Sequence, residues 1–235
     1  LSVAQIGALS DEHIASLDLP ALSALAPAGI GTWSGAQVNS LDSEAGQIGA
    51  LTNDQIAAIA PASLGETGSS FFNSLYPAQI PAFIHDQIGA LGATHLQALG
   101  VQQLQAFTPA QFGWLSDAQI QALRPDQIAS LSISEFGSLR PDEISSFTAE
   151  QAAAVTAPEI QSLNGDQLNA LLVSNGSHLS DAQISWIAPS QIPTISTALI
   201  AGAGARLAVL TTTQLPALTA AQTASVSAAS IAALS

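Results

Sequence analysis

Apolar residues recur at every eighth position along almost the whole chain, with polar and small residues between them. The pattern is clearest from Leu115 onward, where the segments LSDAQIQA, LRPDQIAS, LSISEFGS and LRPDEISS follow one another. The apolar residues that open these and the next segments are Leu115, Leu123, Leu131, Leu139, Phe147, Val155, Leu163 and Leu171. The same spacing links Leu75 to Phe107, Leu9 to Leu41 and Leu210 to Leu234. A fixed short period is typical of a repeat protein whose units contact only near neighbours.

Each eight-residue unit, or octad, reads as the start of a helix. We number its positions from the residue that follows one closing apolar residue (position one) to the next closing residue (position eight). Position one is often Ser or Thr, position two is repeatedly Pro, and position four is usually Gln or Glu. A hydroxyl cap, Pro in the first turn and Gln or Glu three residues after the cap form a capping box. The sequence therefore predicts an all-α solenoid with one short capped helix per octad.

Three other structures do not fit this pattern. One long helix is excluded because each interior Pro would cost roughly 3 kcal/mol. A β-solenoid needs alternating, β-branched segments, whereas these octads are rich in Ala, Gln and Leu. A coiled coil needs a period near 3.5 residues. Because helices this short are unstable alone, positions five and eight must be buried against other octads.

The octad pattern predicts the role of individual positions. We expect positions five and eight to be buried and position six to be exposed. We expect Gln119, Gln127 and Gln183 to act as capping partners rather than ligand contacts. The positions expected in the core are Ile120, Leu123, Ile128, Leu131 and Ile144, and those expected at the surface are Gln121, Ala129 and Ser145.

Residues 1–235 are expected to form a single octad-repeat solenoid with four interruptions. Two extra residues fall within 42–51, and one residue is missing within 196–210. Turn-prone residues replace the usual octad starts within 65–73 and 172–179. The sequence does not give the number of octads per superhelical turn. Since the chain starts and ends inside the repeat, we expect it to be a segment of a longer protein.

Composition narrows the possible functions. The chain has no Cys, no Met and three Lys or Arg residues, and its net charge is −14. Such acidity argues against nucleic acid or an anionic membrane as partner, since both bind basic surfaces. The most apolar stretch, residues 198–210, is too short to span a membrane and contains Arg206.

The acidic residues suggest helix capping before they suggest calcium binding. Most of them fall in the first turn of an expected helix, where a negative charge is stabilised by about 0.3–1 kcal/mol. These residues are Glu12, Asp54, Asp86, Asp126, Asp142, Glu143, Glu150, Asp166 and Asp181. No calcium-loop motif is present. Arg124 and Arg140 each follow a closing Leu, where a cation near the preceding carbonyls is favoured.

No motif predicts catalysis, a cofactor or a metal site. The histidines lack ligand spacing, and His13 and His95 occupy position four as variant capping residues. Serines occur without a nucleophile-elbow motif, and the GAGAR segment (residues 202–206) lacks a full phosphate-binding fingerprint. We therefore expect that the chain is not an enzyme.

Aromatic residues are few and mostly fall near core positions. Trp33, Trp114 and Trp186 are expected to pack in the core. The segment FFNSLY (residues 71–76) is the one aromatic cluster beside turn-prone residues. Its Phe71, Phe72 and Tyr76 form a candidate partner-binding platform.

The string L-T/S-x-x-Q-I-x-A-L, seen in LTNDQIAAI, LSDAQIQAL and LRPDQIASL, resembles runs in very large bacterial exoproteins of the adhesin or haemagglutinin-like type. The resemblance implies an extracellular or cell-surface protein in which such runs serve as stalk, spacer, adhesive surface or self-assembling filament. No binding residues carry over from it. The alternative is an interaction scaffold that presents one face to a protein or peptide partner.

Overall fold

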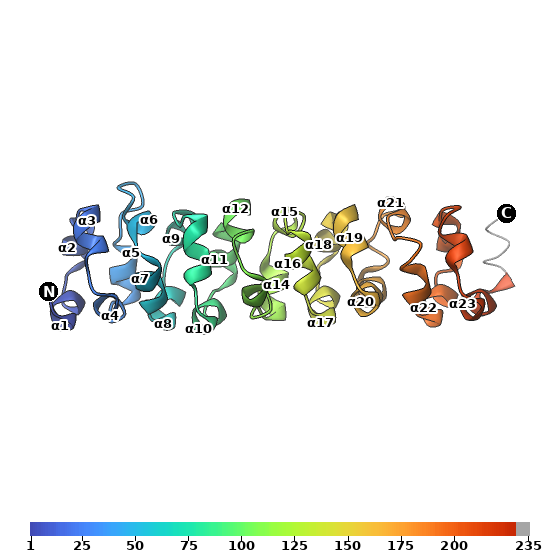
Figure 1. Cartoon of the computed structure of the whole chain (residues 1–235), viewed down its shortest axis with the longest axis horizontal. Coiled ribbons are helices and arrows are strands. Elements are labelled where there is room, and N and C mark those ends of the chain that lie inside the picture. The colour runs from blue at the N-terminus through green and yellow to red at the C-terminus, as the bar shows by residue number, and fades with distance from the viewer. Residues whose placement is uncertain (229–235) are drawn as a thin grey trace. The chain divides into compact units, whose positions relative to one another are not determined.

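The computed structural model describes residues 1–228, and within them the chain is all-helical. Short helices follow one another in regular succession (Figure 1), so the prediction of an all-α repeat solenoid is confirmed. The contacts divide the chain into a first unit, Leu1–Leu123, and a second unit that begins at Arg124. Whether the units form one continuous solenoid stays a prediction. Leu234, which the octad pattern includes, lies outside the described residues.

The first unit contains fourteen α-helices and one 3₁₀ helix, each beginning within an octad. They are α1 (Val3–Gly7), α2 (Asp11–Ala15), α3 (Leu19–Ser23), α4 (Pro27–Ile30), α5 (Gly35–Asn39), α6 (Gln47–Ala50), α7 (Asn53–Ala58), α8 (Pro61–Gly65), α9 (Ser69–Asn73), η1 (Pro77–Ala82), α10 (His85–Gly89), α11 (Ala93–Ala98), α12 (Val101–Leu104), α13 (Pro109–Phe112) and α14 (Asp117–Ala122).

The described part of the second unit continues the same succession, with more 3₁₀ helix toward its end. Its helices are α15 (Pro125–Ile128), α16 (Ile133–Ser138), α17 (Pro141–Ser145), α18 (Ala149–Ala154), α19 (Ala157–Ser162), α20 (Gly165–Asn175), α21 (Asp181–Ser185), η2 (Ile192–Thr194), α22 (Thr197–Gly202), η3 (Gly204–Val209), η4 (Leu215–Ala217) and α23 (Ala220–Ser225). No described helix is long and apolar enough to cross a membrane.

The capping box explains why each helix starts where it does. At α14, Ser116 Oγ accepts a hydrogen bond from Gln119 N at 3.3 Å, and Gln119 Oε1 accepts from Ser116 N at 2.9 Å. The closing Leu123 then adopts extended backbone angles, φ −64° and ψ 140°, which end the helix. Where Pro occupies position two, as in Pro125 of α15, its fixed φ suits the first helical turn.

The core follows positions five and eight. Ile120, Leu123, Ile128, Leu131 and Ile144 are all buried, which confirms the prediction for these residues. At position six, Gln121 and Ala129 are exposed as expected, whereas Ser145 is half-buried. Position four is also buried in most octads, which the octad pattern alone does not predict.

Within each unit, helices that lie three octads apart in the chain pack against one another. In the second unit α15 packs on α18, α16 on α19 and α17 on α20. The first helix of the α15–α18 pair begins at Pro125 and the other at Ala149, 24 residues later. The first unit repeats the arrangement with α4 and α7, α5 and α8, and α11 and α14.

The interruptions differ in their structural effect. Within 42–51, the two extra residues form a turn in which Asp42 Oδ1 accepts from Glu44 N and Ala45 N, and Gly46 takes a left-handed φ of 79°. Within 65–73 the octad spacing holds, because Thr67 takes the buried closing position and Gly68 precedes α9 as its N-cap. The turn-prone residues there cause no change of register.

The interruption at 172–179 lengthens a helix. Its octad has Leu172 at position one, so no hydroxyl or carboxylate side chain caps a new helix. The preceding helix α20 therefore continues across the octad boundary to Asn175. Within 196–210, where one residue is missing, the 3₁₀ helix η3 replaces an ordinary octad helix, and Gly204 has a positive φ of 56°.

Candidate functional site

The polar residue at position four joins neighbouring turns of the solenoid. Gln183 shows the arrangement: its Oε1 accepts from Ser180 N at 2.9 Å, which caps its own helix α21. Its Nε2 donates to Ala152 O and Val155 O, each at 2.9 Å, at the end of helix α18. One amide thus satisfies the start of one helix and the end of another. We call this paired interaction the amide clamp.

The amide clamp recurs in both units. It is formed by Gln37, Gln47, Gln55, Gln79, Gln87, Gln103, Gln111, Gln119, Gln167, Gln183, Gln191, Gln214 and Gln222. In regular octads the acceptors lie 31 and 28 residues earlier, as for Gln119 with Ile88 and Leu91. The clamp therefore reaches four octads back while helices pack three octads apart, so each superhelical turn holds between three and four octads.

Capping by Gln119, Gln127 and Gln183 is confirmed, but capping is only half of the role of position four. The second role is hydrogen-bond donation to an earlier turn, and the sequence feature that indicates it is the preference for Gln over Glu at this position. Either residue completes a capping box, but only the amide also carries N–H groups that can donate to carbonyls.

Other side chains replace Gln at position four by supplying the same donor and acceptor atoms. His95 Nδ1 accepts from Gly92 N at 3.1 Å, and its Nε2 lies 2.9 Å from Thr67 O. These partners fix the neutral tautomer with the proton on Nε2, since a backbone N–H can only donate and a carbonyl can only accept. His13 caps in the same way without a second partner. Both histidines thus act as the predicted capping variants.

Two further substitutions keep only the bond to the earlier turn. Asn175 Nδ2 donates to Ile144 O at 3.3 Å. Arg206, in the octad that lacks a residue, donates through Nη1 to Gly176 O and through Nη2 to Leu179 O at 2.6 Å. The longer Arg side chain spans the gap that the missing residue leaves.

A second set of side-chain bonds links octads three apart. Asn169, at position six of its octad, donates from Nδ2 to Thr194 O at 2.8 Å and accepts at Oδ1 from Ser196 N at 2.8 Å. Asn39 makes the matching pair with Glu66 O and Gly68 N. Polar side chains at two octad positions are therefore committed to joining the turns.

Charged residues also serve their own helices. All nine acidic residues that we assigned to first helical turns lie there. Arg124 Nε donates to Asp126 Oδ1 at 3.0 Å, and this hydrogen bond holds the pKa of Asp126 below its ordinary value. Arg140 Nη2 lies 2.8 Å from Glu143 Oε1. Within residues 1–228 no group of three or more His, Asp or Glu residues could hold a metal ion.

The structure separates the three aromatic residues proposed as a binding platform. Phe71 and Phe72 are each 1% exposed and belong to the core, where Phe72 stacks on His95 with ring centroids 4.8 Å apart. Tyr76 is 61% exposed. Its ring lies over Gly49, where any Cβ would stand 2.5 Å from Tyr76 Cε2. Tyr76 alone is available to a partner, because Phe71 and Phe72 fill positions four and five of their octad.

The tryptophans occupy different environments. Trp33 is buried, and its Nε1 donates to Ile6 O at 3.0 Å. Trp114 is 37% exposed and meets the edge of His85, so its expected place in the core was wrong. Trp186 is half-buried.

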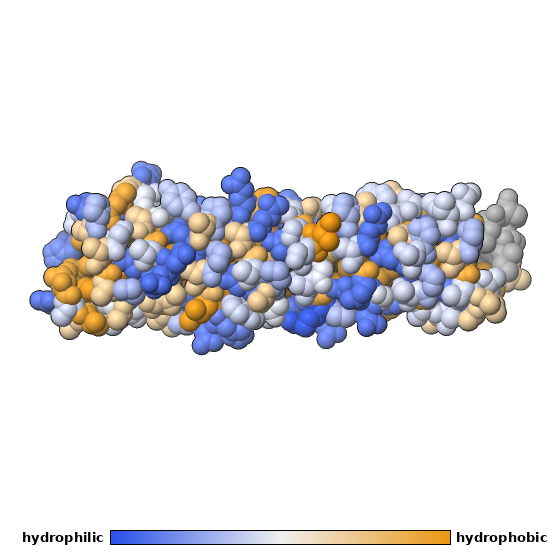
Figure 2. All heavy atoms as spheres, in the orientation of Figure 1, coloured by the Kyte–Doolittle hydropathy of each residue, from blue (hydrophilic) through white to orange (hydrophobic). Residues whose placement is uncertain are grey.

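Apart from the N-terminal end, polar side chains separate the small hydrophobic spots on the face shown in Figure 2.

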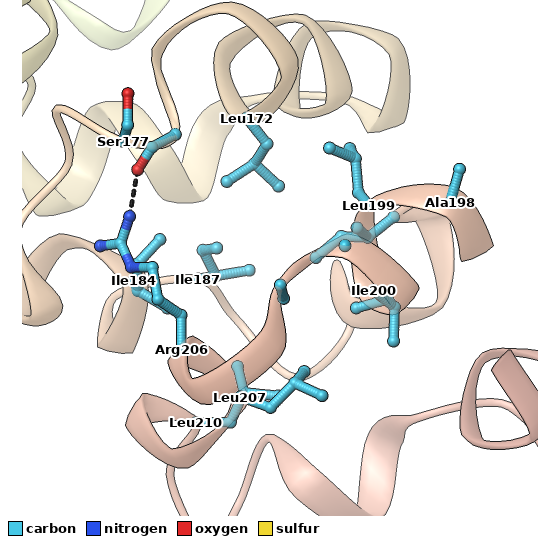
Figure 3. A pocket seen from close by; sticks show the side chains of 14 residues that line it. Leu172, Ser177, Ile184, Ile187, Ala198, Leu199, Ile200, Arg206, Leu207 and Leu210 are labelled. Atoms are coloured by element: carbon cyan, nitrogen blue, oxygen red, sulfur yellow. Dashed lines mark hydrogen bonds between the residues drawn. The ribbon is translucent and has the colours of Figure 1, made fainter. Parts of the chain in front are cut away.

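The second unit contains an apolar cavity of about 340 Å³ beside its register change. Leu172, Ile187 and Leu199 point toward the open space, and Arg206 lies at one side (Figure 3). The cavity exists because small residues replace large ones: Gly176 occupies position five and Ala203 position eight of their octads. The Arg206 guanidinium is already engaged by two carbonyls, so the cavity suits an apolar group.

Comparison with known proteins supports the repeat and little beyond it. The family model described as the ALTTAQ repeat matches residues 97–133. This match covers regular octads in which Gln103, Gln111, Gln119 and Gln127 occupy position four. No curated protein matches the chain significantly. The chain thus contains a recognised repeat region.

Proposed function

We propose that this chain is a structural repeat segment, a stalk, spacer or self-assembling filament, of a bacterial cell-surface or secreted protein. The amide clamp is the observation that carries the proposal. In the clamp, the recurring polar side chain of the octad hydrogen-bonds to the preceding turn. The repeat itself therefore connects successive turns mechanically. The extracellular location and an adhesive role rest on the resemblance of the octad to runs in bacterial exoproteins.

A spacer should depend on length and on repeat phase, and little on any one exposed side chain. The test removes 32 residues, 132–163, from the protein that carries this segment, because this length corresponds to the clamp spacing of four octads. We expect normal folding and a graded loss of reach, measured as attachment of cells that display the protein. A matched control replaces the exposed Ile133 and Val173 with Ser at unchanged length. If attachment were lost in this control and not in the deletion, the segment would act through a local binding surface and the spacer proposal would be wrong.

Cellular location needs its own measurement. Protease added to intact cells should cleave an epitope-tagged parent protein if the segment is at the surface. Protection of the tag until the cells are lysed would contradict the proposed location.

The apolar cavity supports the alternative of an interaction scaffold. A cavity lined by Leu172, Ile187 and Leu199 could accept an apolar side chain of a partner protein or peptide. Ala203→Phe would fill it from within. Lost partner binding at an unchanged melting temperature would support the scaffold, and unchanged binding would argue against the cavity as its site.

A further inference from the structure

Glu159 occupies a position four that elsewhere holds the amide clamp. Its Oε2 accepts from Thr156 N at 2.6 Å and from Thr156 Oγ1 at 2.7 Å, just as the Gln Oε1 atoms serve their caps. Its Oε1 takes the place of the amide nitrogen, is buried and has no hydrogen-bond partner. Glu159 as a whole is 2% exposed. The buried oxygen therefore stands where a donor is required.

The regular octads show what that donor would contact. Gln191, four octads after Glu159, donates to Ile160 O and Leu163 O, which lie 31 and 28 residues before it. Gln183 follows the same rule with Ala152 and Val155. For Glu159, the residues at these separations are Ile128 and Leu131, in the same unit. An ionised carboxylate offers these carbonyls only acceptor atoms, whereas a protonated carboxyl supplies one O–H donor.

We propose that Glu159 holds a proton in the folded chain and donates it to the carbonyls of Ile128 and Leu131, so that this join between turns weakens when the carboxyl ionises. Burial of the carboxyl raises the pKa of Glu159 above its ordinary value of 4.5, although the two hydrogen bonds from Thr156 act in the opposite direction. The geometry and the pKa of this group therefore agree.

The charged residues near Glu159 do not take over the role of its proton by pairing with the carboxylate. Helix α16 packs on α19 and carries Glu135 as its one ionisable residue. Asp126 with Arg124 belongs to α15, and Asp181 belongs to α21. Arg124 pairs with Asp126, and both Asp126 and Asp181 have mostly exposed side chains. None of these residues contributes to the raised pKa of Glu159.

Glu143 provides the internal contrast. It also lies at position four, but Arg140 at position one of its octad places Nη2 2.8 Å from Glu143 Oε1. The corresponding residue before Glu159 is Thr156, which has no charge. Glu143 therefore has a cation at position one of its octad, whereas Glu159 has none there.

The direction of the pH effect follows from the raised pKa. A group that binds its proton more tightly when folded stabilises the fold fully below its unfolded pKa. That contribution is lost as pH rises through the folded-state pKa. The bond made by Glu159 should therefore be complete below about pH 4.5 and absent well above the folded-state value.

The test compares thermal melts of the full chain and Glu159→Gln from about pH 4 to about pH 8. The amide supplies a donor at every pH, so the variant should melt several degrees above the parent at the alkaline end. The difference should shrink toward the acidic end. Glu150→Gln is the matched control, because Glu150 is an exposed carboxylate in a first helical turn. Equal pH dependence in the parent and Glu159→Gln would overturn the proposal.

Two further measurements distinguish a proton held at Glu159 from a metal cation bound there. In a ¹³C-glutamate NMR titration, the carboxyl resonance that disappears in Glu159→Gln should titrate at higher pH than the exposed glutamates, and an ordinary midpoint would overturn the proposal. Gln191→Glu should create a second pH-dependent step of the same sign, because it places a carboxyl in the equivalent site. If sodium or potassium ions, and not pH, restored the parent's melting temperature, the site would bind a cation and the proton model would be wrong.

Discussion

At the scale of single residues, position four requires a side chain with an acceptor and a donor at the same end. The amide of Gln supplies both, and the imidazole of His95 supplies both in one tautomer. The acceptor half could be predicted from the sequence because its partner, the cap N–H, lies three residues away. The donor half could not, because its acceptors lie 31 and 28 residues earlier and become neighbours only through the superhelix.

Gln183→Ala should be more destabilising than loss of a helix cap alone. It removes the side-chain partner of the Ser180 N–H and of the Ala152 and Val155 carbonyls, of which Ala152 O still accepts from Val155 N. A buried polar group left without a partner costs on the order of 1–3 kcal/mol. Gln5→Ala is the control, since Gln5 caps α1 but is exposed. Chemical denaturation should show the larger loss for Gln183→Ala. Equal losses in the two variants would reduce the role of Gln183 to capping.

His95 should tolerate replacement by Gln far better than replacement by Ala. Gln restores both the acceptor for Gly92 N and the donor to Thr67 O, whereas Ala removes both and leaves Phe72 without its stacked ring. In the parent, ¹⁵N NMR should show the imidazole proton on Nε2. A proton on Nδ1 of the neutral ring would contradict the hydrogen-bond assignment.

At the scale of the element, a regular octad makes one helix too short to persist alone, so its stability comes from neighbouring turns. Helix starts were predictable because the cap, Pro and Gln signals lie within one octad. Two features of the elements were missed for physical reasons. The extension of α20 depends on the absence of a cap at Leu172. Trp114 meets the ring of His85, which lies three octads earlier in the chain, and the octad pattern does not show this contact.

Truncating the core residue of one element should be costly. Ile128→Ala removes a side chain that is completely buried at position five, and such truncations cost about 2–5 kcal/mol. Ile133→Ala, at an exposed position two in the next octad, should change stability by no more than about 0.5 kcal/mol. Urea unfolding of both variants measures the difference, and similar losses would contradict the assignment of positions five and two.

At the scale of the whole molecule, the same eight-residue pattern, repeated along the chain, builds each unit. Most described octads present a helix start, two core residues and a polar side chain at position four, so one octad can replace another in the same phase although their exposed residues differ. The four-octad reach of the clamp was not visible in the sequence, because every octad carries the same signals and none marks where a superhelical turn closes. The apolar cavity was equally hidden, since it arises where Gly176 and Ala203 from different octads meet.

The most direct test of octad stacking is a comparison of two deletions by circular dichroism. Removing residues 148–155 takes out one octad and joins Phe147 to Thr156 in the same phase. Each later octad therefore still has another octad four octads earlier in the chain to bond with. We predict a cooperative melt and unchanged helicity per residue. Removing only residues 148–151 takes away Thr148 and Gln151, which form the capping box of α18, and leaves the core residues out of phase. This deletion should lower both helicity and melting temperature sharply. Equal damage from the two deletions would contradict the claim that octads stack through a clamp set by repeat phase.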